Sequence, residues 1–187
     1  GNSMILLLDP SLDPSRLHDT PMSLVSHEFF HNWNGGAIPA GELWFVEGAT
    51  VYFSFQALLD TRTIVPEQYR RRREAVAGRF TGNPYTGRVA IADAELGDLG
   101  DHDMVNLLYD GGFLAAEAID AHLREATGGR IGLIDVMRRM YEEGATADGA
   151  SLSRIAEETA GVSLVPLVDA LVRDPASTRL LAAHGTS

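Results

Sequence analysis

The chain contains no cysteine, which excludes disulfides, thiolate metal sites and cysteine nucleophiles, so that any metal must be held by histidine and carboxylate side chains. It also lacks lysine: all 15 basic residues are arginine, against 26 acidic residues and a formal net charge of −11. Nucleic acid is therefore not expected as a partner, because phosphate binding needs a surplus of basic residues. No run of 18 apolar residues is present, so no membrane span is expected.

The remaining composition is that of a folded globular protein, with 45% hydrophobic and 22% charged residues in a chain of 187. The absence of lysine is typical of GC-rich bacterial genomes, and the compartment stays open between cytoplasm and periplasm. "GNSMILLLDP" has no basic stretch or cleavage site of a signal peptide. We expect a piece of a longer protein, with an edge strand and loop of a truncated β region (1–20), a helical domain (21–175) and a C-terminal tail (176–187).

Hydrophobic spacing predicts a mainly α (α+β) fold with a little sheet at its beginning. A strand is expected at 5–9 and helices at 21–33 and 42–59, separated by a loop rich in glycine and proline. Another helix begins at Pro66, and a long one runs from 102 to 127, where two glycines stop it. Three further helices follow, ending near Gly144, Gly161 and Asp174. The basic run 70–73 is interpreted as a solvated helix face.

The stretch "SHEFFHNWNGG" carries the chemistry, because it places His27 and His31 four residues apart on a predicted helix. Residues at this spacing lie about 40° apart on one helix face, so both imidazoles can bind one metal ion. Glu28 lies about 100° further round, beside the metal, where its carboxylate can take a proton from water that the metal holds. This HExxH pattern is typical of zinc peptidases.

A catalytic zinc needs a third protein ligand, and "LWFVEGATVYF" supplies Glu47. The Gly/Pro loop allows the chain to return over the first helix, and Gly48 allows the two backbones to approach closely. A lone carboxylate among such apolar neighbours needs a partner to offset its desolvation, and a zinc ion is a suitable one.

HExxH followed by a glutamate in "WFxEG" resembles the signature of gluzincin metallopeptidases. "HEFFHNWN" and "LWFVEGATVYF" are most similar to the glycyl aminopeptidase family, and more distantly to aminopeptidase N type enzymes. "LLYDGGFLAAEAIDAHLREATGG" extends the resemblance, although Gly111 stands where the family usually has lysine. The resemblance implies a thermolysin-like helical catalytic domain and a peptide substrate, and β and PDZ regions that are missing here.

By the same resemblance, His27, His31 and Glu47 would bind zinc, Glu28 would be the general base, and Tyr109 would donate a hydrogen bond to the oxyanion. Tyr52 and His102 are weaker candidates for that last task. His18, His122 and His184 are expected to have no functional role.

The expected function is zinc-dependent peptide-bond hydrolysis, with an aminopeptidase implied by the resemblance. An endopeptidase with the same zinc site and a non-catalytic module that binds peptides or a partner remain alternatives. Glu42 and Glu95 are the candidates for holding a substrate ammonium group.

Overall fold

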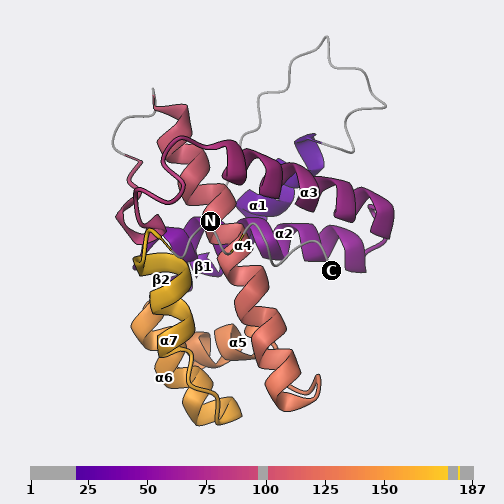
Figure 1. The fold of residues 1–187 in the computed structure, drawn as a ribbon. Helices are drawn as coiled ribbons and strands as arrows, with labels where there is room; N and C mark the ends of the chain where they lie inside the picture. Colours follow the sequence, from indigo (N-terminus) through magenta and orange to yellow (C-terminus); the bar gives the residue numbers. More distant parts are fainter. Residues whose placement is uncertain (1–19, 97–100, 177–180, 182–187) are drawn as a thin grey trace.

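The computed structural model describes residues 20–96, 101–176 and 181, and within them the chain is mainly helical (Figure 1). A mainly α fold is therefore confirmed. In chain order the elements are α1 (Thr20–Phe30), β1 (Asn34–Gly35), β2 (Ile38–Pro39), the π-helical segment η2 (Trp44–Gly48), α2 (Ala49–Asp60), α3 (Pro66–Gly82), the 3₁₀ turn η3 (Ile91–Asp93), α4 (His102–Thr127), α5 (Leu133–Glu143), α6 (Gly149–Ala160), α7 (Val165–Val168) and the π-helical segment η4 (Asp169–Arg173).

Helix α4 is the central element, and its 26 residues extend for about 39 Å at 1.5 Å per residue. It begins where the Asp101 side chain accepts a hydrogen bond from the Met104 amide, and it ends at Gly128, whose φ is 62°. Residues 113–116 are completely or almost completely buried. Figure 1 shows α1, α2 and α3 gathered at one end of α4, and α5, α6 and α7 at the other.

Two glycines bring η2 and α4 into contact backbone to backbone. A Cβ on Gly48 would lie 2.3 Å from the Gly112 Cα, and a Cβ on Gly112 would lie 2.5 Å from the Trp44 carbonyl oxygen. Gly48 has an ordinary helical φ of −67°, so space and not backbone conformation requires glycine here. The predicted close approach is present, but its partner is α4 and not α1. The contact fixes Glu47 against the part of α4 that carries Tyr109.

The small sheet lies elsewhere than predicted. Strands β1 and β2 pair in parallel within the expected Gly/Pro loop, with Asn34 opposite Ile38. The strand predicted at 5–9 lies outside the described residues, as do most of the predicted N-terminal region and tail. A helix is present where one was predicted at 42–59, but its first turn is the wider π-helical segment η2, and regular α-helix begins at Ala49.

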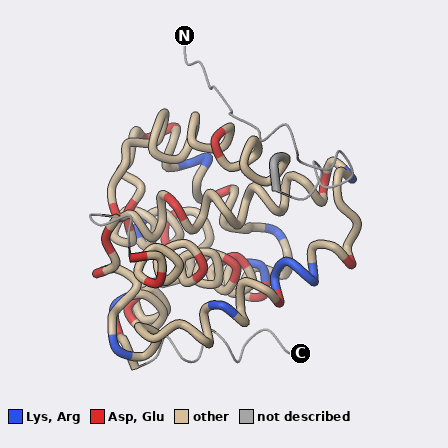
Figure 2. The backbone as a smooth tube through the Cα atoms, turned by 90° about the horizontal axis from the view of Figure 1, so that it is seen from above, with Lys and Arg blue, Asp and Glu red and all other residues tan. Residues whose placement is uncertain are grey.

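Charges of opposite sign are interspersed along the chain, as Figure 2 shows. In the basic run of α3, Arg70 is exposed and pairs with Glu67 and Glu74, as a solvated face should. Arg73 instead pairs with Glu117 of α4 at 2.9 Å, with only 14% of its side chain exposed. The run is therefore partly a packing surface, which corrects the interpretation from sequence. No helix in the described part of the chain is long and apolar enough to span a membrane.

Candidate metal centre

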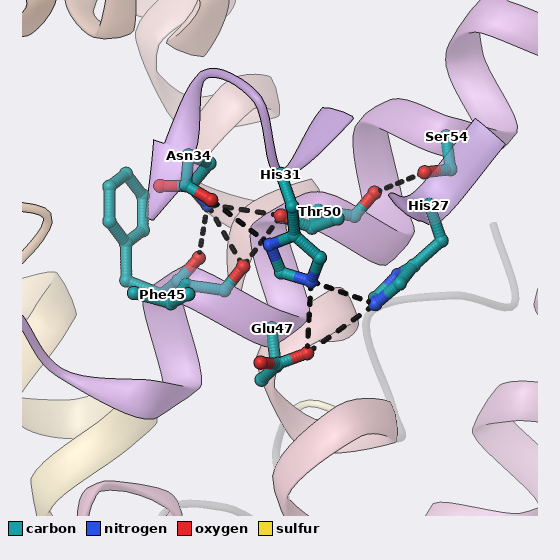
Figure 3. Close-up of polar contacts among 8 residues, drawn as sticks. His27, His31, Asn34, Phe45, Glu47, Thr50 and Ser54 are labelled. Carbon is teal, nitrogen blue, oxygen red and sulfur yellow. Dashed lines mark hydrogen bonds and ion pairs between the residues drawn. The ribbon is translucent and has the colours of Figure 1, made fainter. Parts of the chain in front are cut away.

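Helix α1 and the residue directly after it present His27 and His31 on one face, as the four-residue spacing predicts, because the His31 amide still donates to the His27 carbonyl at 3.2 Å. Their Nε2 atoms lie 3.0 Å apart, and the two rings meet edge to face (Figure 3). The side chains are 13% and 23% exposed, so the pair is sheltered by protein but still accessible from solvent. Two imidazoles held this closely can share one bound cation.

Segment η2 brings Glu47 to the same point from the other side (Figure 3). Its Oε2 atom lies 3.4 Å from the Nε2 atoms of both His27 and His31. These are ion-pair distances, but neither contact has the geometry of a hydrogen bond, and Oε2 is buried with no hydrogen-bond partner among the described residues. A buried carboxylate oxygen without a partner is costly, and a cation at this point would supply one.

The tautomer of His31 strengthens this argument. Its Nδ1 lies 3.0 Å from the carbonyl oxygen of Asn34, and a carbonyl can only accept, so Nδ1 carries the hydrogen. In the neutral ring the Nε2 lone pair then points toward His27 Nε2 and the buried oxygen of Glu47. Electron pairs facing one another in this way repel unless a proton or a metal ion lies between them.

The separations of the three atoms also fit a zinc ion. Zinc bonds of about 2.0–2.1 Å in tetrahedral geometry place neighbouring ligand atoms about 3.3 Å apart. The observed separations are 3.0, 3.4 and 3.4 Å. The cluster of His27, His31 and Glu47 also has the nitrogen and oxygen donors and the count of three that catalytic zinc sites use, with a fourth position left for water or substrate.

The pKa values show how strongly these groups interact. Burial acts to raise the pKa of Glu47, but the His27, His31 and Tyr109 side chains outweigh it and hold that pKa well below its ordinary value. Glu47 in turn raises the pKa of His31 against the opposing effect of burial. Glu47 is therefore a carboxylate at neutral pH, as a metal ligand must be.

Tyr109 and Glu28 border this cluster. The Tyr109 ring lies 5.9 Å from the His27 ring, and burial, together with the nearby Glu47 carboxylate, raises the pKa of Tyr109. Its hydroxyl is thus a neutral donor at pH 7. Glu28 is exposed on α1, and its charge contributes to the raised pKa values of His31 and Tyr109. The structure therefore brings His27, His31 and Glu47 into one cluster with Tyr109 beside it, and Glu28 lies close enough for its charge to affect the pKa values of two of these residues.

The weaker candidates lie elsewhere. Tyr52 is buried and donates to Asp120 at 2.9 Å, which commits its hydroxyl to the contact between α2 and α4. His102 is exposed in the first turn of α4, about 10 Å along the helix from Tyr109. Glu42 binds the Trp44 indole, the Gly149 amide and Arg173, so both of its oxygens are engaged. His122 is exposed, and His18 and His184 lie outside the described residues.

Gly111 occupies the position at which the resemblance leads us to expect lysine, and the surrounding side chains enclose it tightly. A Cβ there would lie 2.8 Å from Ile91 Cδ1 and 2.9 Å from Phe80 Cε2. Both atoms belong to completely buried side chains. Packing by η3 and α3 has therefore closed the space into which a longer side chain would extend.

Asn34 is the residue of this centre that sequence reasoning missed. It is completely buried. Its backbone carbonyl accepts a hydrogen bond from the ligand His31, and its side chain donates to the carbonyl of Phe45, two residues before the ligand Glu47. The only signal in the sequence is a polar residue three positions after His31, inside a turn-forming stretch where asparagine is common.

An apolar cavity of about 310 Å³ lies nearby but does not include the ligands. It is lined by Phe30, Trp33, Ile38, Ile134, Met137, Arg138 and Tyr141. The candidate ligands therefore lie outside the lining of this cavity.

Comparison with known families supports a peptidase. Residues 20–106 match the sequence model of the family described as M61 glycyl aminopeptidase. The matched segment covers somewhat less than half of the chain and includes His27, Glu28, His31 and Glu47, but it ends before Tyr109. No curated protein matches the chain. The match supports the predicted peptidase family, whereas the wider resemblance to gluzincins and aminopeptidase N type enzymes stays a prediction.

Proposed function

We propose that this chain is the catalytic part of a zinc-dependent peptidase in which His27, His31 and Glu47 hold the metal. One observation carries the proposal: the two Nε2 atoms converge within 3.4 Å of one another and of a buried Glu47 oxygen that has no hydrogen-bond partner in the described part of the chain. The match of residues 20–106 to a glycyl aminopeptidase family supports the same conclusion independently.

The residues around the ligands then have separate tasks. Zinc, when bound, polarises the substrate carbonyl and lowers the pKa of water. The Glu28 carboxylate accepts the proton of the attacking water and delivers it to the nitrogen of the leaving amine. The Tyr109 hydroxyl, kept neutral by its raised pKa, donates a hydrogen bond to the oxyanion that forms on the substrate. Glu28 requires access to water and substrate, and its exposure provides it.

The assignment of Glu28 predicts that Glu28→Gln retains zinc but loses hydrolysis. We expect a fall in kcat of at least about 10²-fold, the lower end of what general-base catalysis contributes. Zinc content and peptide turnover would be measured on the same preparations, with Glu125→Gln, an exposed glutamate of α4, as the matched control.

Two results would contradict the proposal in different ways. Hydrolysis retained by Glu28→Gln would exclude Glu28 as the base. A parent chain that binds zinc but hydrolyses no peptide would favour the non-catalytic binding module instead.

The aminopeptidase specificity rests on the family match. Glu42, one of the two candidates for holding a substrate ammonium group, is engaged with Trp44, Gly149 and Arg173, which leaves the exposed Glu95. Peptides with free and with acetylated N-termini distinguish the alternatives. An aminopeptidase cleaves only the free form, and equal cleavage of both would indicate an endopeptidase.

A further inference from the structure

Asn34 lies completely buried between α1 and η2 (Figure 3). Its Nδ2 is surrounded by three oxygen atoms: the carbonyl of Phe45 at 2.9 Å, the carbonyl of Val46 at 3.0 Å and the hydroxyl of Thr50 at 3.2 Å. The Thr50 hydroxyl itself donates to the Val46 carbonyl at 2.6 Å. An oxygen in place of Nδ2 would therefore face two carbonyl oxygens, so the orientation of the amide is fixed.

These contacts bear directly on Glu47. Phe45 and Val46 are the two residues before it in η2, whose wider turn departs from the regular α-helix that follows. Segments of π-helix are frequent at functional sites and need side-chain partners for the carbonyl groups that they expose. The Asn34 amide, with Thr50, provides such partners and so holds the turn that directs Glu47 toward α1.

The same residue also fixes His31 through its backbone. The Asn34 carbonyl accepts the hydrogen bond from His31 Nδ1 at 3.0 Å and so leaves the Nε2 lone pair directed at the cluster. Asn34 thus contacts the ligand His31 directly and also contacts the two residues that precede the ligand Glu47, which lies 16 positions after His31.

We infer that Asn34 is a positioning residue for the metal centre: its amide sets the orientation of Glu47 through η2, while its carbonyl sets the tautomer of His31. The inference rests on the proposed zinc site. Loss of the buried amide should therefore weaken metal binding, since mutation of outer-shell partners of metal ligands typically changes the metal affinity about 10–100-fold.

The test is Asn34→Leu, which keeps the branched shape of the side chain and adds no charge but removes the donor to Phe45 and Val46. We expect zinc, in competition with a chromophoric chelator, to bind about 10–100-fold more weakly than to the parent. The absorption spectrum of the Co²⁺-loaded variant should also change shape, because the orientation of Glu47 has changed. Far-UV circular dichroism of the metal-free protein reports whether the fold is retained.

Asn83→Leu is the matched control. Asn83 is also a buried asparagine and donates to the Asp103 carbonyl at 2.7 Å, but it contacts no ligand. This control should bind zinc as the parent does, even if its melting temperature falls. Thr50→Val, which removes only the hydroxyl that donates to Val46, should weaken zinc binding by a smaller factor. If Asn34→Leu does not fold, the zinc affinity of Thr50→Val tests the inference in its place.

The possible outcomes distinguish a failure of the proposed zinc-dependent function from a failure of the positioning role of Asn34. A parent chain that does not bind zinc contradicts the proposed function. A parent that binds zinc tightly, with Asn34→Leu and Thr50→Val that bind it equally tightly and give the same Co²⁺ spectrum, contradicts the positioning role alone. Equal losses of affinity in Asn34→Leu and Asn83→Leu would show that only general stability is involved, and would also overturn the inference.

Discussion

At the scale of residues, the centre consists of three side chains that direct their polar atoms at one point. The Nε2 atoms of His27 and His31 lie 3.0 Å apart, and the buried Oε2 of Glu47 lies 3.4 Å from both. Such an arrangement persists only when the surrounding structure imposes it. Here Asn34 and the glycine contact at Gly48 impose it.

The role of Tyr109 as an oxyanion donor can be tested by a substitution that removes its hydroxyl alone. Tyr109→Phe removes the hydroxyl but keeps the ring beside His27, so zinc content should be unchanged while kcat falls about 10²-fold, as for loss of one oxyanion donor. Steady-state kinetics and metal analysis of the same sample measure both. Tyr141→Phe, at a tyrosine with 54% exposure, is the control. A Tyr109→Phe enzyme with the turnover of the parent would remove Tyr109 from the mechanism.

At the scale of elements, the contact between η2 and α4 decides where the third ligand lies. Any side chain at Gly48 meets backbone atoms of Gly112 at 2.3 Å, and backbone cannot move aside as a flexible side chain can. Helix α4 would have to shift, and with it both Tyr109 and the buried residues that follow.

Gly48→Ala should therefore lower the free energy of unfolding by about 3 kcal/mol, the upper range for overpacking a core. It should also weaken zinc binding. Gly78→Ala is the opposite case, because a Cβ on Gly78 meets nothing within 4 Å on the exposed face of α3. That change should stabilise the protein by about 0.5–1 kcal/mol. Urea denaturation of both variants measures the two effects, and a Gly48→Ala protein as stable as the parent would refute the close contact.

Some of these elements could be predicted from sequence and others could not, for physical reasons. Helix α4 was predicted at 102–127 because its signals are local: a hydrophobic stripe and two stopping glycines. The convergence of His27 and His31 follows from helix geometry alone. The π-helical turn had no local signal, and the position of Asn34 in a turn-forming stretch did not indicate its role, because the Asn34 amide bonds to carbonyls 11 and 12 residues away and only the folded chain brings them together. The partner of Gly48, 64 positions further along the chain, was missed for the same reason.

At the scale of the whole molecule, Glu42 joins segments that are distant in sequence. One carboxylate oxygen accepts from the Trp44 indole and from the Gly149 amide at the start of α6, and the other accepts from Arg173 in η4. The segment that leads into η2 is thereby tied to the C-terminal helices. Burial acts to raise the pKa of Glu42, but the bonds from Gly149, Trp44 and Arg173 outweigh it, and the pKa lies below its ordinary value of 4.5.

A lowered pKa in the folded state means that the ionised Glu42 stabilises the fold above about pH 4.5, and that this contribution is lost as the pH falls through the folded-state pKa. Glu42→Gln should therefore be less stable than the parent at pH 7, and the difference should shrink on acidification below pH 4.5. Urea denaturation of both proteins between pH 3 and 7 measures it, with Glu125→Gln as the control. A difference that is constant across this range would contradict the assignment.

The most direct test of the central claim is an anomalous-difference map, recorded at the zinc absorption edge, from crystals of the purified protein. The account predicts one strong peak within about 2.0–2.2 Å of His27 Nε2, His31 Nε2 and a Glu47 carboxylate oxygen. Zinc-soaked crystals with no peak between these three side chains would contradict it.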